Sequence, residues 1–410
     1  MTRANTFRIA VRKFDAFESA IAKQWASFEA DARTGLTLDA VPLDLHPLEA
    51  ALFTSNGMLN GAWDVCFIST DWIAAMHAAG AALDLATLFA ADPIPDLPTA
   101  WTDSLLRLQR IGDTIRGTPY HDGPECLIYR KDIFRDPANQ AVYQHRFGQP
   151  LAPPKTWDEF HQIARFLHNP DESCYGAIFA SFPDGHNAVY DFLLQLWSRG
   201  GNLLSPSGDT TLNTPQAADA LVFYRNILTD TTAVHPRCQQ LDSVQAGLAF
   251  AAGEAAMMVN WFGFAAMAHT APDSKVKDLI DIAAIPHGPH GTSISLNVYW
   301  ILSIAAGSPH PDIAWRFLKH CLTPAMDKLT TTEGAIGCRK STWSDPQVNH
   351  AIPFYHRMES LHRTAREIPQ LPHWPRLAAI IDALITATIT TSQPIETLLS
   401  DADKKAAATT

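Results

Sequence analysis

The feature that most constrains this chain is the alternation of apolar, β-rich runs with amphipathic stretches near its start. The alternating runs fall at residues 7–11, 18–31, 36–44, 47–58, 63–69 and 71–80. Strands that alternate with helices predict an α/β fold with a mostly parallel sheet covered on both faces. Ligands of such sheets bind beyond the carboxyl ends of the strands. This rule selects residues 12–14 and 69–72.

Two later helices carry their own start signals. Thr156 is followed three residues on by Glu159, which is the spacing of a capping box. Farther along, Asn213 or Thr214 precedes Pro215, and proline is favoured at the first helical position because an N–H there would have no partner. We therefore expect helices to begin at residues 157 and 215.

Length and composition set the broad class. At 410 residues the chain is too long for one ordinary core, so we expect two domains or one interleaved pair. With 47% hydrophobic and 18% charged residues, the chain can bury a sizeable core. The formal net charge is −11 and no run is rich in Lys or Arg, which argues against nucleic-acid or polybasic membrane binding.

Several absent motifs exclude further classes. The N-terminal MTRANTFRIAVRKF lacks the apolar core of a signal peptide, and no apolar run approaches the roughly 18 residues of a membrane helix. The six cysteines show neither CxxC nor Cys/His ligand spacing, so we expect no metal and no cofactor. GxSxG, Walker, dinucleotide and HExxH motifs do not occur, and we expect no enzymatic activity.

The segment FAAGEAAMMVNW, residues 250–261, follows a buried-looking run with a polar and an aromatic residue. One interpretation is that a strand ends at a cavity, where Trp261 is presented to something flat. The alternative is that Trp261 is a core residue, which is the commoner role of a tryptophan. The composition leaves both open.

Segments along nearly the whole chain resemble, in order and spacing, the family 1 extracellular solute-binding proteins of bacterial ABC importers, a group that includes the maltose-binding protein. Each segment alone is weakly specific, because apolar helices with a glycine are common. The order and the gaps carry the resemblance. The segments are WASFEADARTGLTLDAV, WDVCFISTDWIAAMHAAGAALDL, WTDSLLRLQRIGDTIRGTPYHDGPECLIYRKDIF, PPKTWDEFHQIARFL, LWSRGGNLL, FAAGEAAMMVNW, AAIPHGP and AWRFLKHCLTPAMDKLTTTEGAIGCRKS.

The resemblance implies the two-lobe fold of type II periplasmic binding proteins, with crossing strands and a ligand cleft that closes by hinge bending. Gly/Pro-rich segments at 117–124 and 286–291 would fall at the crossings and act as hinges. The implied lobes are residues 1–119 with 288–322, and residues 120–287 with 323–410.

The resemblance also implies which residues meet a sugar. Hydroxyls need paired donors and acceptors, since a desolvated unpaired group costs about 1–3 kcal/mol, and apolar ring faces stack on aromatic side chains. The candidate ligand-binding residues are Lys13, Phe14, Asp15, Ser69, Asp71, Trp72, His121, Asp122, Glu125, Trp261, Phe262, Asn297, Tyr299, Trp300 and Arg339.

Most of these candidates have a structural alternative. Asp71 could cap the following helix together with Ser69 or Thr70, and residues 13–15 could be solvated surface. The polar residues around the first crossing, 121–125, could form only a turn. Arg339 follows Cys338, where the family usually has proline, and it could make a surface ion pair instead of holding a ligand.

The expected size of the ligand follows from one position at which this sequence departs from the family pattern. Asn297, Tyr299 and Trp300 occupy a position where many members have two glycines. Bulky residues at a cleft wall shrink the pocket. We therefore expect a mono- or disaccharide, a polyol or a sugar derivative rather than a long oligosaccharide.

The function implied is that of a monomeric, periplasmic subunit of an ABC importer that delivers a small carbohydrate to a membrane permease. One alternative is a cytoplasmic sugar-sensing protein on the same fold, motivated by the missing signal peptide. A hydrolase or transferase is a weaker alternative. His121 beside Asp122 could support acid–base work, but no nucleophile is positioned next to them in the sequence.

Overall fold

The computed structural model describes residues 5–94 and 96–409, and the chain divides into two compact units. Unit 1 contains the chain up to Gly123 together with Asn297–His362 and Glu367–Trp374. Unit 2 contains Pro124–Leu296, Arg363–Arg366 and the chain from Pro375 on.

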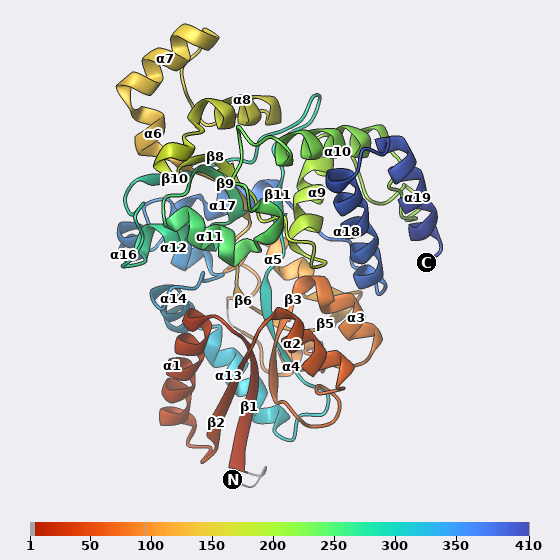
Figure 1. Ribbon diagram of the computed structural model, residues 1–410. Helices are drawn as coiled ribbons and strands as arrows, with labels where there is room; N and C mark the ends of the chain where they lie inside the picture. The colour runs from red at the N-terminus through yellow and green to blue at the C-terminus, as the bar shows by residue number, and fades with distance from the viewer. Residues whose placement is uncertain (1–4, 95, 410) are drawn as a thin grey trace. The chain divides into compact units, whose positions relative to one another are not determined.

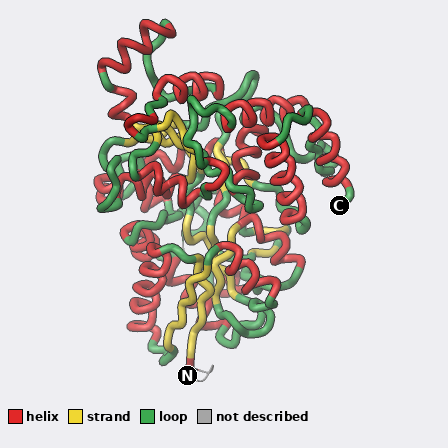
Figure 2. The backbone as a smooth tube through the Cα atoms, viewed as in Figure 1, coloured by secondary structure: helices red, strands yellow, loops and turns green. Residues whose placement is uncertain are grey.

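Unit 1 is built on a five-stranded sheet of order β2-β1-β3-β12-β6. Strand β1 pairs in parallel with β2 and β3, whereas β12 is antiparallel to β3 and β6. In Figure 2 the strands of this sheet lie side by side, with helices along both sides. The larger elements of unit 1 are β1 Thr6–Arg12, α1 Asp15–Ala32, β2 Thr37–Leu43, α2 Leu45–Glu49, β3 Val65–Ser69, α3 Ile73–Ala78, α4 Ala86–Ala91, α5 Asp103–Leu108, β6 Thr118–His121, β12 Trp300–Ile304, α13 Pro311–Cys321, α14 Pro324–Thr332, α15 Lys340–Trp343, α16 Pro346–Ala351 and α17 Met358–Thr364 (Figure 1).

Unit 2 is built on a four-stranded sheet of order β10-β7-β9-β8, in which β9 is antiparallel to β7 and parallel to β8. Its elements are β7 Glu125–Arg130, α6 Lys131–Arg135, α7 Pro137–Phe147, α8 Trp157–Leu167, β8 Tyr175–Ile178, α9 Asn187–Trp197, α10 Pro215–Leu228, α11 Ser243–Ala251, β9 Ala255–Trp261, α12 Phe262–Thr270, β10 Ile280–Ala283, α18 Trp374–Thr390 and α19 Ile395–Ala407 (Figure 1). Four short strands complete the list, the pairs β4 Arg110–Ile111 with β5 Thr114–Ile115 and β11 Ser295–Asn297 with β13 Ala365–Glu367.

The predicted helix starts are confirmed. Thr156 accepts a hydrogen bond from the backbone of Glu159, and the Glu159 side chain accepts one from the Thr156 backbone, which completes the capping box of α8. At α10, Thr214 rather than Asn213 is the cap, and Pro215 takes the first position.

The division into units differs from the implied lobes at residues 323–362. We expected this segment in the second lobe, and the structure groups it with unit 1. The reason is the packing of α14 on α1: Gln24 donates to the Thr330 hydroxyl at 2.9 Å, and Ser19 bonds to Glu333 at 2.5 Å. The first crossing, after Gly123, lies inside the expected segment 117–124, whereas the chain next crosses after Leu296, beyond 286–291.

Candidate functional site

One edge of the unit 1 sheet gathers most of the candidates. The parallel strands β1 and β3 end at Arg12 and Ser69, and β12 begins with Trp300, which is opposite Ser69 on one side and His121 on the other. The loops that follow β1, β3 and β6 therefore leave the sheet at the same edge. This is the edge that the strand-end rule selects.

Aromatic rings line this edge in a connected row, which we call the edge aromatic cluster: Phe14, Phe17, His121, Trp300 and Trp72. Phe17 contacts Phe14 at 5.1 Å and His121 at 4.8 Å between ring centroids. Trp300 packs edge-on against Trp72 at 5.8 Å. Trp72 is buried, whereas Phe14, His121 and Trp300 keep part of their surface exposed. The partly exposed rings can offer apolar faces to a ligand.

The loop after β3 is fixed to the loop before β12. The Thr70 backbone N–H donates to the Tyr299 carbonyl at 3.0 Å, and the Tyr299 N–H donates to the Thr70 hydroxyl at 3.1 Å. Ser69 makes no side-chain capping bond. Asp71, which is 7% exposed, is thus carried by a loop of defined geometry next to Trp72.

The loop after β1 is more open. Lys13 and Asp15 are exposed, and the Lys13 ammonium lies 3.5 Å from Asp44 in a solvent-screened pair. Only Phe14 of this loop joins the edge aromatic cluster.

His121 and Asp122 end β6 side by side in sequence but differ in environment. Burial lowers the pKa of His121 to about 4, against an opposing effect of Asp122, so the ring is neutral at pH 7. Its Nδ1 accepts the Ile336 N–H at 2.9 Å. Asp122 is 1% exposed, and its Oδ2 lies 2.6 Å from His362 Nε2. Its Oδ1 has no hydrogen-bond partner among the described residues.

Two candidates on the segment before β12, Tyr299 and Asn297, differ in their hydrogen bonding. Tyr299 is 1% exposed, its hydroxyl donates to the Leu105 carbonyl, and burial raises its pKa well above the usual value. Its predicted ligand contact is corrected to a core role, because the side chain points into unit 1. Asn297 is fully buried, and neither polar atom of its amide has a hydrogen-bond partner among the described residues.

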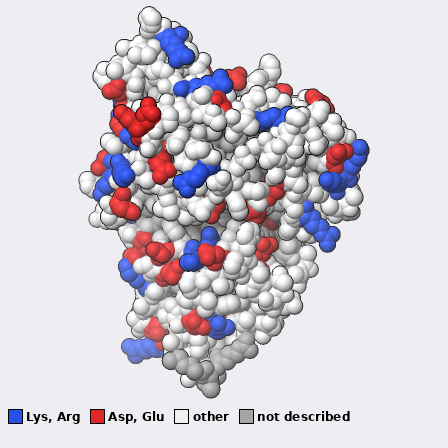
Figure 3. Space-filling view, viewed as in Figure 1, with Lys and Arg blue, Asp and Glu red and all other residues white. Residues whose placement is uncertain are grey.

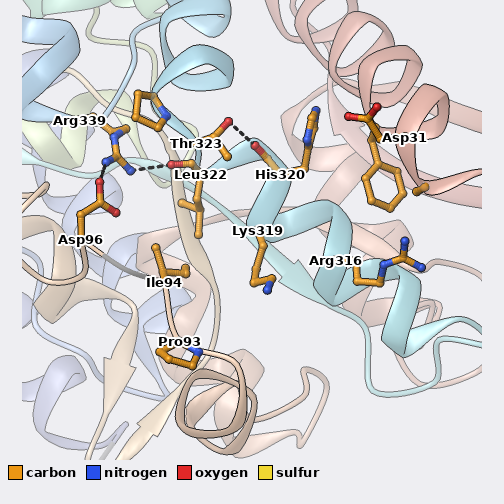
Figure 4. A pocket seen from close by; sticks show the side chains of 13 residues that line it. Asp31, Pro93, Ile94, Asp96, Arg316, Lys319, His320, Leu322, Thr323 and Arg339 are labelled. Atoms are coloured by element: carbon orange, nitrogen blue, oxygen red, sulfur yellow. Dashed lines mark hydrogen bonds and ion pairs between the residues drawn. The ribbon is translucent and has the colours of Figure 1, made fainter.

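Arg339 lies at a separate pocket of unit 1, of about 650 Å³, that is drawn in Figure 4. Its guanidinium pairs with Asp96, donates to the Leu322 carbonyl at 2.6 Å and lies 4.5 Å over the Trp101 ring. The side chain is 2% exposed, so the alternative of a surface ion pair is replaced by a buried one. These contacts give Arg339 a structural role in this pocket.

In unit 2, Trp261 is the last residue of β9 and is paired in register with Glu125, the first residue of β7. Trp261 keeps part of its surface exposed and packs edge-on against Tyr190 at 5.7 Å. Asn260 faces inward and donates to the Ser243 carbonyl at 2.9 Å. Trp261 is therefore not fully buried, and its stacking on a ligand stays a prediction.

Phe262, the next residue, is fully buried at the start of α12. We predicted a ligand contact for it, and the structure corrects this to a core position. The turn from strand to helix after Trp261 sends the two neighbouring aromatic side chains to different surroundings.

Two buried carboxyls accompany Trp261 in unit 2. Glu125 is 5% exposed, its Oε2 has no hydrogen-bond partner among the described residues, and burial with the nearby Asp191 raises its pKa well above the usual value. Burial also raises the pKa of Asp191 to about 7, against hydrogen bonds from Tyr224 and Ser181. The Tyr224 hydroxyl donates to Asp191 at 2.6 Å. Buried carboxyls with raised pKa values are frequent at binding sites.

Sequence reasoning missed the residues that support these candidates: Ser104, Tyr190, Asp191, Tyr224, Trp343 and His362. For Asp191 a signal existed, because it is a lone carboxyl within the apolar helix NAVYDFLLQLW. The others touch their partners only through the tertiary fold.

The structure offers little for other classes of function. Among residues 5–94 and 96–409, no group of three or more His, Cys, Asp or Glu side chains is arranged to hold a metal ion. Within the same ranges, no helix is both long and apolar enough to cross a bilayer. Acidic and basic side chains are interspersed on the face drawn in Figure 3.

Comparisons with known proteins give one answer. A family model described as bacterial extracellular solute-binding protein matches residues 14–328. A probable ABC transporter-binding protein of Deinococcus radiodurans is 24% identical over 69% of this chain, a match that spans 66% of its own length, just under two thirds. A putative binding protein of Brucella abortus is 24% identical over 93% of this chain and 87% of its own.

Solved structures share the fold. The maltose-bound MalE3 of T. maritima superposes with a TM-score of 0.85 at 20% identity, covering 98% of both chains. A solute-binding protein of Agrobacterium radiobacter in complex with ribitol gives a TM-score of 0.86 at 22% identity, again over 98% of both. One from Agrobacterium vitis with bound D-mannitol gives 0.81 at 17%, over 98% of this chain and 97% of its own. The two-lobe fold of this chain is that of sugar-binding proteins.

Proposed function

Because the chain belongs to the bacterial extracellular solute-binding proteins, we propose that it binds a small carbohydrate or polyol by hinged closure and delivers it to an ABC permease. One relative is described as a probable ABC transporter-binding protein, and three solved structures that share the fold hold maltose, ribitol and D-mannitol. Delivery places the protein outside the cytoplasm, as a monomer that meets its permease transiently.

One observation carries the choice of ligand class. Each unit presents a partly exposed tryptophan at a strand terminus, with a buried carboxyl close in the chain or in register: Trp300 opposite Ser69, two residues before Asp71, in unit 1, and Trp261 opposite Glu125 in unit 2. An aromatic face with adjacent hydroxyl-binding oxygens is the pairing that sugars require. We propose that each set is a sugar-contacting element of its own unit.

The charge of the site favours a neutral ligand. The candidate edge of unit 1 carries Asp71 and Asp122 with a neutral His121, and its lysine is exposed and paired with Asp44. In unit 2, burial raises the pKa of Glu125 well above its usual value and that of Asp191 to about 7, which favours uncharged carboxyls there. A sugar acid would place its charge near the carboxylates of Asp71 and Asp122.

A thermal-shift panel of maltose, ribitol, D-mannitol, D-tagatose, glucuronate, amino acids and short peptides tests the proposal. A ligand that binds only the native state stabilises it by about 2.7 kcal/mol at a hundredfold excess over Kd. We expect a rise in Tm with at least one neutral sugar or polyol. A rise with peptides or amino acids alone would refute the ligand class, and consumption of any compound would favour an enzyme.

A further inference from the structure

In unit 1, a series of buried side chains joined by hydrogen bonds ends at Asp122. The Thr102 and Ser104 hydroxyls lie 2.9 Å apart, the Ser104 hydroxyl lies 2.8 Å from His362 Nδ1, and His362 Nε2 lies 2.6 Å from Asp122 Oδ2. Ser104, His362 and Asp122 are 6%, 6% and 1% exposed. The indole of Trp343 stacks on the His362 ring at 4.9 Å with an interplanar angle of 10°.

The direction of each bond follows from the chemistry of the groups. A carboxylate only accepts, so His362 Nε2 donates to Asp122. The Nδ1 atom of a neutral imidazole with a proton on Nε2 can only accept, so the Ser104 hydroxyl donates to it. Thr102 then donates to Ser104. His362 is thereby held in one tautomer and one ring orientation, which fixes Asp122 Oδ2.

The chain of serine, imidazole and carboxylate is also the set used in acyl transfer, where the hydroxyl is the reacting group. In unit 1 the group at the end without a partner is the carboxylate, whereas acyl transfer needs a reactive serine hydroxyl there. Ser104 is buried at the far end of the chain and engaged with Thr102, whereas the atom left without a partner is the Asp122 Oδ1 oxygen. The arrangement holds a carboxylate; it does not activate a nucleophile.

A second buried Asp–His pair in the same unit shows what a structural pair looks like. Asp64, 1% exposed, precedes β3 and so lies at the opposite edge of the sheet from Asp122. Its Oδ1 accepts from Ser308 at 2.6 Å and contacts His310 Nδ1 at 3.2 Å, and its Oδ2 accepts the Arg8 N–H at 2.8 Å. Both oxygens of Asp64 have partners, whereas Oδ1 of Asp122, whose side chain is 0% exposed, has none among the described residues.

A buried carboxylate oxygen without a hydrogen-bond partner lowers the stability of the fold, by about 1–3 kcal/mol. Asp122 directly follows His121 of the edge aromatic cluster, at the edge of the sheet to which the candidate ligand residues belong. A ligand hydroxyl would supply the missing donor.

We propose that His362 is a positioning residue for ligand binding: held by Ser104 and Trp343, it fixes Asp122 Oδ2 so that Oδ1 accepts a hydroxyl of the bound sugar. This inference rests on the proposed function and deepens it by adding His362 and Ser104 to the residues that determine affinity. Neither contacts the ligand itself.

The test is a mutant cycle on affinity, measured by calorimetric titration with whichever of maltose, ribitol, D-mannitol and D-tagatose raises Tm most. Asp122→Ala should weaken binding about tenfold to a hundredfold, the range for losing a hydrogen bond to a buried charged group. His362→Leu should weaken it by a similar factor, and His362→Gln, whose amide can donate to Asp122 and accept from Ser104, should recover most of the affinity.

The decisive measurement is the double variant. If His362 acts through Asp122, then His362→Leu should cause no further loss of affinity in the Asp122→Ala background. Additive losses would overturn the proposal, as would an unchanged affinity in His362→Leu. His310→Leu is the matched control: it breaks the Asp64 pair at the opposite edge and should lower stability while leaving affinity unchanged.

A readout without ligand separates this inference from the proposed function. Imidazole nitrogen NMR should show a proton on His362 Nε2, identified by the resonance lost in His362→Gln, and Asp122→Ala should shift that resonance. An unshifted resonance would overturn the positioning role even if sugars bind. If the resonance shifts but no panel compound binds the wild type, the proposed sugar function fails, and the sugar-hydroxyl role of Asp122 fails with it.

Discussion

Trp261 and Glu125 are directly opposite each other on β9 and β7, so their side chains stand on the same face of the unit 2 sheet. One keeps an exposed ring surface, and the other is a buried carboxyl with an unpaired oxygen. We propose this ring face and carboxyl as a sugar-binding pair.

Removal of the Trp261 ring should therefore affect binding more than folding. We expect Trp261→Ala to weaken sugar binding by about 1–3 kcal/mol, the range for a binding anchor. Calorimetric titration and urea denaturation measure the two effects. Trp261→Phe keeps an aromatic face and should retain part of the affinity. A loss of about 3–5 kcal/mol of stability with unchanged affinity would instead identify a core residue.

Adjacent residues at the start of β12 should respond in opposite ways. Trp300→Ala removes a partly exposed ring of the edge aromatic cluster and should weaken binding by about 1–3 kcal/mol. Tyr299→Phe removes only the buried hydrogen bond to Leu105 and should cost about 0.5–1.5 kcal/mol of stability with no change in affinity. The corrected role of Tyr299 fails if its variant binds more weakly.

A substitution at Arg339 should change the stability of the protein but not its affinity for the ligand. Arg339→Met keeps a flexible side chain of similar length but loses the guanidinium, with its bonds to Asp96 and Leu322 and its contact over the Trp101 ring. We expect a loss of about 1–3 kcal/mol in the free energy of unfolding, because Asp96 is half exposed and can be resolvated. Ligand affinity should remain that of the wild type, and a tenfold loss would restore Arg339 to the binding residues.

Asp191 should make stability depend on pH in an unusual direction. Its pKa is raised from 3.8 to about 7 in the folded protein, chiefly by burial. Between about pH 4 and 7 the folded chain therefore holds a proton that the unfolded chain releases, and the Asp191 contribution to stability declines as pH rises, by up to about 1.4 kcal/mol per unit.

The measurement is urea denaturation at several values across that window, for wild type and Asp191→Asn. The variant keeps an acceptor for Tyr224 but does not titrate, so the difference between the two slopes isolates Asp191. The buried carboxyl of Asp327, with a pKa of about 6, contributes equally to both proteins, whereas the pKa of Glu125, which Asp191 raises, differs between them. Parallel slopes would show that Asp191 is ionised in the folded state.

The sequence predicted what depends on local pattern. The strand-end rule selected Ser69, Asp71 and Trp72, and the structure places them at the carboxyl end of β3; the capping box at Thr156 is confirmed. Contacts between distant segments were out of reach. His362 meets Asp122 across 240 residues, and nothing in either local sequence marks the pair.

The errors also have a physical origin. Tyr299 and Trp300 are neighbours in an extended chain, whose side chains alternate, so only one could face the edge, and the pattern did not say which. The resemblance implied that residues 323–362 belong to the second lobe, whereas the structure groups them with unit 1. A helix such as α14 carries no sign of which of two cores its apolar face will join.

The position of β12 between β3 and β6 makes the order of synthesis matter. All four strands of the unit 2 sheet lie within residues 125–283, whereas the unit 1 sheet waits for Trp300–Ile304 to join β6 to the rest. On the ribosome, the N-terminal unit therefore cannot close its sheet until the strands of the later unit have already emerged. A nascent chain halted near residue 290 should expose an unpaired edge on β3, and that edge is a natural binding surface for chaperones.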